Sequence, residues 1–342
     1  MLSNFVFALL MLIQTTSPAT ILHEPKCSPV ASNLVFQSAD GGLTWQDVSS
    51  GLPHKLEVTN IIADGEELIL SSANGIYRSP VKLKSPMWKK DVFLNDKISG
   101  VFSGRSGRFA RNFDNGFYRE VQNTGTWLPI FKNLNGVWKW AVLECPNEHI
   151  LLGTDHGIYK SSNHGQSWNL ALGDEKVFEL VQKDKVILAN STNGILRSTD
   201  SGETWNWVLR ENNMFRNIGV IGEQLYAITN EDEASKDKNS NQKGMANKLL
   251  ISSDHGQSWK RIDSGLEVGR YVYLNLDKTS SNFINDLTQV GNFMVCSIDS
   301  GIFRSADGGK TWERVLTTKE NHIFNFSSTG HMIYAVKANR GC

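Results

Sequence analysis

Carboxylates on distant strands are the side chains of this chain best suited to catalysis. Hydrolysis of a glycosidic bond uses two facing carboxyl groups, which can come from segments far apart in the sequence. Glu179 and Asp286 both fall in short apolar runs that favour inner β-strands, so they are the candidates for such a pair. A carboxylate on such a strand is more often a solvated channel residue than a catalyst, so we expect no catalytic residue.

Other signatures of chemistry are missing from the sequence. His156, His164 and His255 each stand next to a glycine in a turn-like phrase, without a second His or Cys at ligand spacing. The sequence contains no Gly-x-Ser-x-Gly elbow and no Gly-rich loop that opens a helix. We therefore expect neither a bound metal nor a cofactor.

An eight-residue sequence motif, here called a phrase, is repeated along the chain and indicates the secondary structure that would position any site. The pattern Ser-x-Asp/Asn-x-Gly-x-Thr/Ser-Trp fits residues 38–45, 161–168, 198–205, 252–259 and 305–312. Its Asp or Asn can accept hydrogen bonds from the backbone N–H groups that follow, and its Gly allows the positive φ of a tight hairpin. The Trp then starts the next strand and buries a large ring. The phrase predicts a β-hairpin turn whose Asp, Gly and Trp residues are structural.

The spacing of these turns predicts the fold. Tryptophans that end a complete or degenerate phrase stand at 45, 88, 127, 168, 205, 259 and 312. A period of about forty residues is typical of a four-stranded propeller blade. Two strand-like runs and a Gly-led strand, such as Gly157–Lys160 or Gly301–Arg304, precede the turn in each repeat. We predict an all-β, seven-bladed β-propeller.

The two ends of the chain each supply half a blade. Leu34–Gln37 and Thr44–Val48 are predicted as its outer strands, and His322–Ser327 and Met332–Lys337 as its inner strands. Strands from both termini then close the ring and remove open sheet edges. Because Cys27 and Cys342 flank these strands, we predict a disulfide between them in an exported protein. Cys145 and Cys296 are expected to be buried free thiols.

Residues 1–19 are predicted to be a signal peptide. Phe5–Ile13 is an apolar run too short to span a bilayer, and Ser17-Pro-Ala19 offers small residues for cleavage. We expect an exported protein, secreted or periplasmic, in which residues 20–342 form one propeller domain with no integral membrane segment. The formal net charge is +0 and no basic stripe occurs, so no nucleic-acid partner is expected. We expect a monomer.

The five phrases resemble the Asp-box (BNR) repeats of sialidases, sortilin-type receptors, xyloglucan hydrolases and photosystem II assembly-factor propellers. In those families the boxes lie on turns remote from any active site. Size, blade count and box density are most similar to the photosystem II assembly-factor-like propellers, which implies a non-catalytic binding or assembly scaffold for a protein or glycan. The alternative is a secreted glycoside hydrolase of the sialidase-like type. The Arg-Ile-Pro phrase of sialidases is missing here, and those enzymes have six blades.

Polar residues recur at two positions of the repeat. Arg78, Arg119, Arg197 and Arg304 share one position on the third strand, where we expect a structural role on the solvent side. One position on the innermost strand is expected to line a hydrated central channel, and it would be held by Asn60, Ser99, Lys139, Glu179, Asn217, Asn285 and Asn325.

Two insertions lengthen loops of adjacent blades. Glu231–Lys248 separates the second and third strands of the sixth repeat, and residues 264–282 precede the first strand of the seventh. In a propeller both loops open on the face opposite the box turns, and loops on a rigid scaffold often carry function. Glu231–Lys248 is polar and charged, which predicts a mobile flap. Arg and Tyr are enriched at binding hot spots. We predict an off-centre binding site bounded by Arg216, Arg270, Tyr271, Tyr273 and Asp286.

Overall fold

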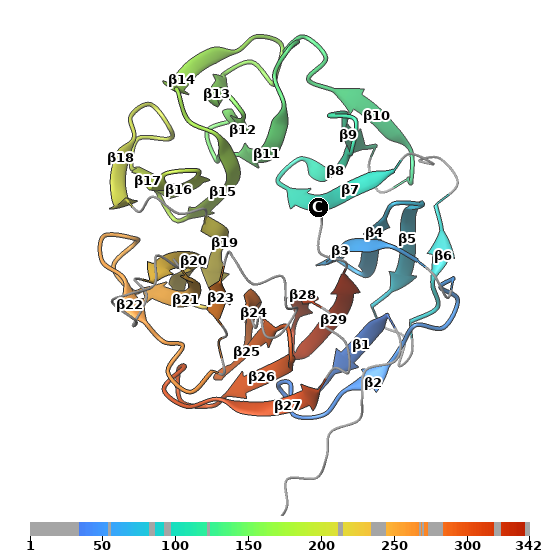
Figure 1. Ribbon diagram of the computed structural model, residues 1–342. Coiled ribbons are helices and arrows are strands. Elements are labelled where there is room, and N and C mark those ends of the chain that lie inside the picture. The colour runs from blue at the N-terminus through green and yellow to red at the C-terminus, as the bar shows by residue number, and fades with distance from the viewer. Residues whose placement is uncertain are drawn as a thin grey trace, which may run out of the picture.

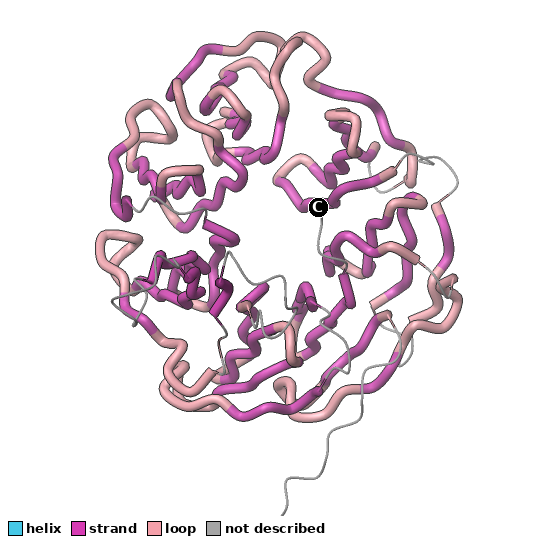
Figure 2. Tube along the Cα trace, viewed as in Figure 1, coloured by secondary structure: helices cyan, strands magenta, loops and turns pink. Residues whose placement is uncertain are grey.

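The computed structural model is a ring of seven antiparallel sheets, which is a seven-bladed β-propeller (Figure 1). The structure describes residues 34–53, 56–81, 86–91, 97–121, 124–210, 215–233, 244–266, 268, 270–272, 283–317 and 323–338. Figure 2 shows strands, turns and loops throughout this part of the chain. These described residues contain no helix long and apolar enough to cross a membrane. The predicted fold class is confirmed.

Six blades take their four strands in chain order, from the channel outwards. Blades two to four contain β3 (Val58–Asp64), β4 (Glu67–Ser72), β5 (Gly75–Pro80), β6 (Lys89–Lys90), β7 (Ile98–Gly104), β8 (Gly107–Asn112), β9 (Phe117–Glu120), β10 (Trp127–Ile130), β11 (Lys139–Glu144), β12 (Ile150–Thr154), β13 (Gly157–Ser161) and β14 (Asn169–Gly173). Blades five to seven contain β15 (Val177–Lys183), β16 (Val186–Ser191), β17 (Gly194–Ser198), β18 (Asn206–Arg210), β19 (Phe215–Ile221), β20 (Gln224–Glu233), β21 (Gly244–Ser252), β22 (Lys260–Arg261), β24 (Ile284–Val290), β25 (Phe293–Ile298), β26 (Gly301–Ser305) and β27 (Glu313–Thr317).

Blade one is built from both ends of the chain. Its strands lie in the order β2-β1-β29-β28, with β1 at Val35–Ser38, β2 at Gln46–Asp47, β28 at Ile323–Thr329 and β29 at Met332–Ala338. The blue β1 and the red β29 lie side by side in Figure 1, which confirms the predicted closure. The predicted signal peptide and the Cys27–Cys342 disulfide lie outside the described residues and stay predictions.

The core consists of seven wedges between neighbouring blades rather than one central cluster. Each middle strand is covered on both faces, and the successive residues Leu68, Ile69 and Leu70 of β4 are all 0% exposed. Such strands are continuous apolar runs instead of the alternating pattern of a half-buried strand. Cys145 and Cys296 are buried in these wedges as free thiols, as predicted.

In the described part of the chain, the sixth blade alone carries an extension beyond four strands. Its strands β20 and β21 pair as far as Glu233 opposite Gly244, and β23 (Arg270–Val272) pairs with the start of β21. The second insertion therefore contributes a strand to the sheet formed by the first. The described ends of Glu231–Lys248 are paired strands, and a mobile flap between them stays a prediction.

Candidate functional site

Each complete box turn is held together by its own side chains. In blade seven, Asp307 Oδ1 accepts hydrogen bonds from Lys310 N at 3.0 Å and Thr311 N at 2.9 Å, and Oδ2 accepts one from Thr311 Oγ1 at 2.7 Å. Ser305 Oγ donates to Asp307 Oδ1 at 2.8 Å. These bonds, led by that of the Thr311 backbone, lower the pKa of Asp307 to about 2. The carboxylate is used within the turn, which is the structural role predicted.

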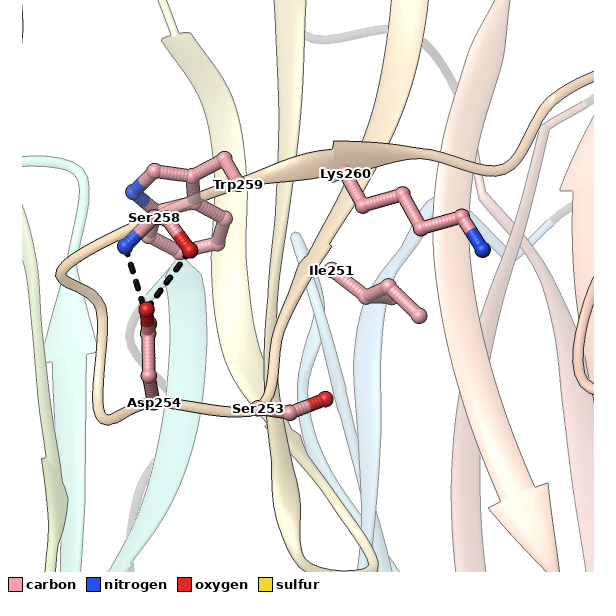
Figure 3. A pocket seen from close by; sticks show the side chains of 6 residues that line it. All are labelled: Ile251, Ser253, Asp254, Ser258, Trp259 and Lys260. Atoms are coloured by element: carbon pink, nitrogen blue, oxygen red, sulfur yellow. Dashed lines mark hydrogen bonds between the residues drawn. The ribbon is translucent and has the colours of Figure 1, made fainter.

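A small cavity of about 230 Å³ lies beside the box turn of blade six. Its lining is Ile251, Ser253, Asp254, Ser258, Trp259 and Lys260 (Figure 3). Figure 3 shows Asp254 turned towards Ser258, whose N and Oγ donate to it at 2.8 Å and 2.6 Å. The one acid of this cavity is therefore occupied in holding the turn.

Polar side chains of the innermost strands join each blade to the next. The side chain of Asn60 on β3 bonds both backbone groups of Val101 on β7. Asn60 Nδ2 donates to Val101 O at 2.9 Å, and Asn60 Oδ1 accepts from Val101 N at 3.1 Å. Glu179 on β15 makes a similar contact at the junction of blades five and six, because its Oε2 accepts from Ile218 N of β19 at 2.9 Å. The same oxygen also accepts from Asn190 Nδ2 at 2.9 Å.

Asp286 is the most heavily bonded member of this set. Its Oδ1 accepts from Asn217 Nδ2 at 3.3 Å, Tyr226 OH at 3.3 Å and Leu287 N at 2.8 Å. Its Oδ2 accepts from Phe326 N at 2.7 Å. One carboxylate on β24 thus links blade six, its own blade and blade one.

Burial raises the pKa of both carboxyl groups, to about 7 for Glu179 and about 6 for Asp286. A raised carboxyl pKa is also what a general acid needs. Here, however, the carboxylate oxygens bond backbone, amide and hydroxyl groups of neighbouring strands, so they hold the blades together. The arrangement gives no support to a catalytic pair.

The innermost strands are out of register with the alignment expected from sequence. A register shift near the start of six of them inserts one residue, for example between Ile98 and Gly100 and between Ile284 and Asp286. The position occupied by Asn60, Glu179, Asn217 and Asn325 is therefore held by Gly100, Ala141 and Asp286 in the remaining blades. The expectation for Ser99, Lys139 and Asn285 was wrong, because the sequence does not show where in each strand the shift falls. The equivalent residue lies one position later in blades three and seven and two positions later in blade four.

The junction of blades three and four uses a different side chain, because Gly100 offers none. Arg111 of β8 donates from Nη1 to Trp140 O at 2.6 Å and from Nε to Ser99 Oγ at 2.9 Å. Burial lowers the pKa of this arginine to about 10.

The structure places the predicted binding-site residues on two adjacent blades. Arg216 lies in β19 at its register shift, and Asp286 bonds the neighbouring residue Asn217. Arg270 and Tyr271 lie in β23, opposite Ala246 and Met245 of β21, and Tyr273 lies outside the described residues. The strand pairing joins the two insertions as their adjacency predicted. A binding role for these residues stays a prediction.

An exposed tryptophan on the same loop face was missed from the sequence. Trp138, just before β11, is 48% exposed, and its backbone N and O both bond Asp155, at 2.8 Å and 3.0 Å. Its ring stacks on Trp140 at 6.2 Å between centroids, and Trp140 contacts Phe178 at 5.8 Å. The closely spaced tryptophans 138 and 140, both outside the box phrases, were the available signal.

Comparison with known proteins supports the fold and leaves the function open. No family model matches the chain, and no curated protein matches it. An ancestral GH74 enzyme superposes with a TM-score of 0.57 at 15% identity, covering 90% of this chain and 46% of the enzyme. YCF48 bound to D1 peptide has a TM-score of 0.57 at 14% identity, covering 91% of this chain and 100% of YCF48. YCF48 from Cyanidioschyzon merolae has a TM-score of 0.56 at 14% identity, covering 83% of this chain and 96% of YCF48. Similarity at this level shows a β-propeller, and the chain spans less than half of the GH74 enzyme.

Proposed function

We propose that this propeller is an exported, non-catalytic scaffold that binds a protein partner on the loop face opposite the box turns. The observation that carries the proposal is the extension of blade six. There β20 and β21 pair as far as Glu233 opposite Gly244, and β23 adds a fifth strand at this end of the sheet. Elements that project from a rigid scaffold are where binding residues concentrate.

The buried carboxylates favour a scaffold over an enzyme. Glu179 and Asp286 are the inner-strand acids that hydrolysis would need, and both are engaged in bonds between blades. Among solved structures of similar fold, YCF48 carries a bound D1 peptide and is covered along its whole length by this chain. A protein or peptide partner is therefore the ligand class we favour over a glycan.

The test compares two double variants, each of which truncates two side chains on one face of the propeller. Arg270→Ala with Tyr271→Ala removes two side chains from β23, whereas Lys310→Ala with Gln257→Ala removes two from the box turns on the opposite face. Proteins crosslinked to each variant in its natural host are identified and the interaction is then measured with purified components. We expect the β23 pair to lose a partner that the wild type and the box-turn pair retain. Equal binding by both double variants would reject the loop face as the docking surface.

The competing function, hydrolysis of glycosides, predicts a different result. A panel of aryl glycosides, including an aryl sialoside, should show no turnover above that of buffer with the purified protein. Turnover by the wild type that disappears in Glu179→Gln or Asp286→Asn would reject the non-catalytic scaffold and show that the protein is a glycoside hydrolase.

Export is tested separately from binding. Amino-terminal sequencing of the protein from its natural host should find a mature chain that begins near residue 20. A chain that retains residues 1–19 would exclude cleavage of a signal peptide and leave the binding proposal intact.

A further inference from the structure

A cation on the third strand of several blades reaches the box turn of the next blade. In blade seven, Arg304 Nε donates to Gly41 O of the blade-one turn at 2.9 Å. In blade five, Arg197 Nε donates to His255 O of the blade-six turn at 2.8 Å. Gly41 and His255 occupy the same place in their phrases, so the contact is a repeated structural device.

Two further blades make the equivalent contact with a carboxylate. Lys160 of blade four pairs with Glu203 in the turn of blade five. Arg78 of blade two pairs with Glu120 of blade three, with 3.0 Å between Nη2 and Oε1. The expectation of a structural role is met for three of the four arginines, Arg78, Arg197 and Arg304.

Arg119 of blade three is the exception. Its side chain is exposed and makes no hydrogen bond or ion pair with any of the described residues. Asn133 instead bonds the turn of blade four, where Nδ2 donates to Gly165 O at 3.2 Å and to Gln166 O at 2.6 Å. The carbonyl group equivalent to those of Gly41 and His255 is that of His164, and Arg119 makes no hydrogen bond to it in the described part of the chain.

The unpaired arginine lines a cavity. This cavity of about 310 Å³ lies between blades three and four on the box-turn face. Its polar lining includes Arg105, Ser106, Arg119, Glu144, His149 and His164. Arg105, from the turn between β7 and β8, likewise makes no hydrogen bond or ion pair within the described part of the chain. Two guanidinium groups without acceptors therefore meet at one cavity.

Two carboxylates, Glu144 and Glu148, also line the cavity. Glu144 accepts from Ser106 through both oxygens, at 2.7 Å from N and 2.5 Å from Oγ. Glu148 lies 3.8 Å from His164, with its Oε2 facing Nε2. Each guanidinium presents five N–H donors and no acceptor. The complementary ligand is a group with several anionic oxygens, since planar guanidinium groups bind such oxygens two at a time.

We propose that this cavity binds the phosphate or sulfate group of a ligand, and that Arg119 and Arg105 hold its oxygens. The site lies on the face opposite the proposed partner surface and is independent of it. Phosphate and sulfate esters share the tetrahedral oxyanion that the donors would surround.

Isothermal titration calorimetry tests the site with two probes, O-phosphoserine and N-acetylglucosamine 6-sulfate, at constant ionic strength. The wild type should bind at least one of them, and the preferred probe identifies the type of ester. Arg119→Ala should weaken binding by about tenfold or more, as expected for lost charge-assisted bonds. Arg119→Lys should weaken it clearly as well, because a lysine keeps the charge and loses the fork. Arg105→Ala should act in the same direction.

Lys310→Ala is the matched control, because it removes one exposed positive charge from the same face at another blade. It should leave the affinity unchanged. All variants alter exposed side chains, so their melting temperatures should equal that of the wild type. Failure of both probes to bind, or equal losses in Arg119→Ala and Lys310→Ala, would refute a specific oxyanion site.

Discussion

Replacement of Glu179 by glutamine should change how the stability of the propeller depends on pH. Glu179 is buried between blades five and six, where its Oε2 accepts from Asn190 and from the backbone of Ile218. Glutamine has the same shape and keeps an acceptor oxygen, but it does not titrate. The variant therefore isolates the proton of this one carboxyl group.

The direction and size of the effect follow from the raised pKa. Burial moves the pKa of Glu179 from 4.5 to about 7 in the folded protein, so the folded state binds more protons than the unfolded state between these values. The free energy of unfolding therefore falls as pH rises through this range. This change in pKa corresponds to about 3 kcal/mol of stability, which is present below pH 4.5 and lost above pH 7. Asp286 contributes in the same direction, since burial raises its pKa from 3.8 to about 6.

Urea denaturation of the wild type and Glu179→Gln at several pH values between 4.5 and 8 measures the difference. The stability advantage of the wild type over the variant should shrink by about 3 kcal/mol across this range. Glu57→Gln, at an exposed position, is the control and should run parallel to the wild type. If the curve of Glu179→Gln also ran parallel to that of the wild type, Glu179 would not be buried as a protonated carboxyl group.

Three further predictions concern the turns and the closure of the ring. Gly301→Ala would place a Cβ 1.9 Å from a backbone oxygen of β27 and should lower the melting temperature far more than Gly291→Ala, which also has positive φ but open space around it. Asp307→Ala should lower the melting temperature because backbone N–H groups of the turn lose their acceptor. The affinity of the folded protein for a loop-face partner should stay the same. Loss of binding at an unchanged melting temperature would contradict a purely structural role of the box. Thiol labelling of the denatured, unreduced exported protein should find two free cysteines if Cys27 and Cys342 are joined, and four labelled thiols would exclude that bond.

The degenerate turn of blade three shows why some stabilising contacts stay hidden in the sequence. The loss of the Ser and Asp of its box is visible, but the replacement is not. Glu120 accepts from Gly125 N at 2.8 Å and pairs with Arg78 at 3.0 Å and Arg108 at 3.3 Å. These partners come from two blades, so only the packing of one blade on the next brings them together.

The sequence by itself determined the architecture of this protein. Blade number, strand order and closure by both termini follow from a local phrase and its period, because each hairpin turn is stabilised by residues within a few positions of one another. The tertiary structure alone decided how the polar side chains are used. Asp286 rather than Asn285 lies at the inner-strand position of Asn60 and Glu179, and Arg119 lines a cavity without the turn contact that Arg197 and Arg304 make. These outcomes depend on which residues of neighbouring blades meet, and a repeat pattern carries no information about such contacts.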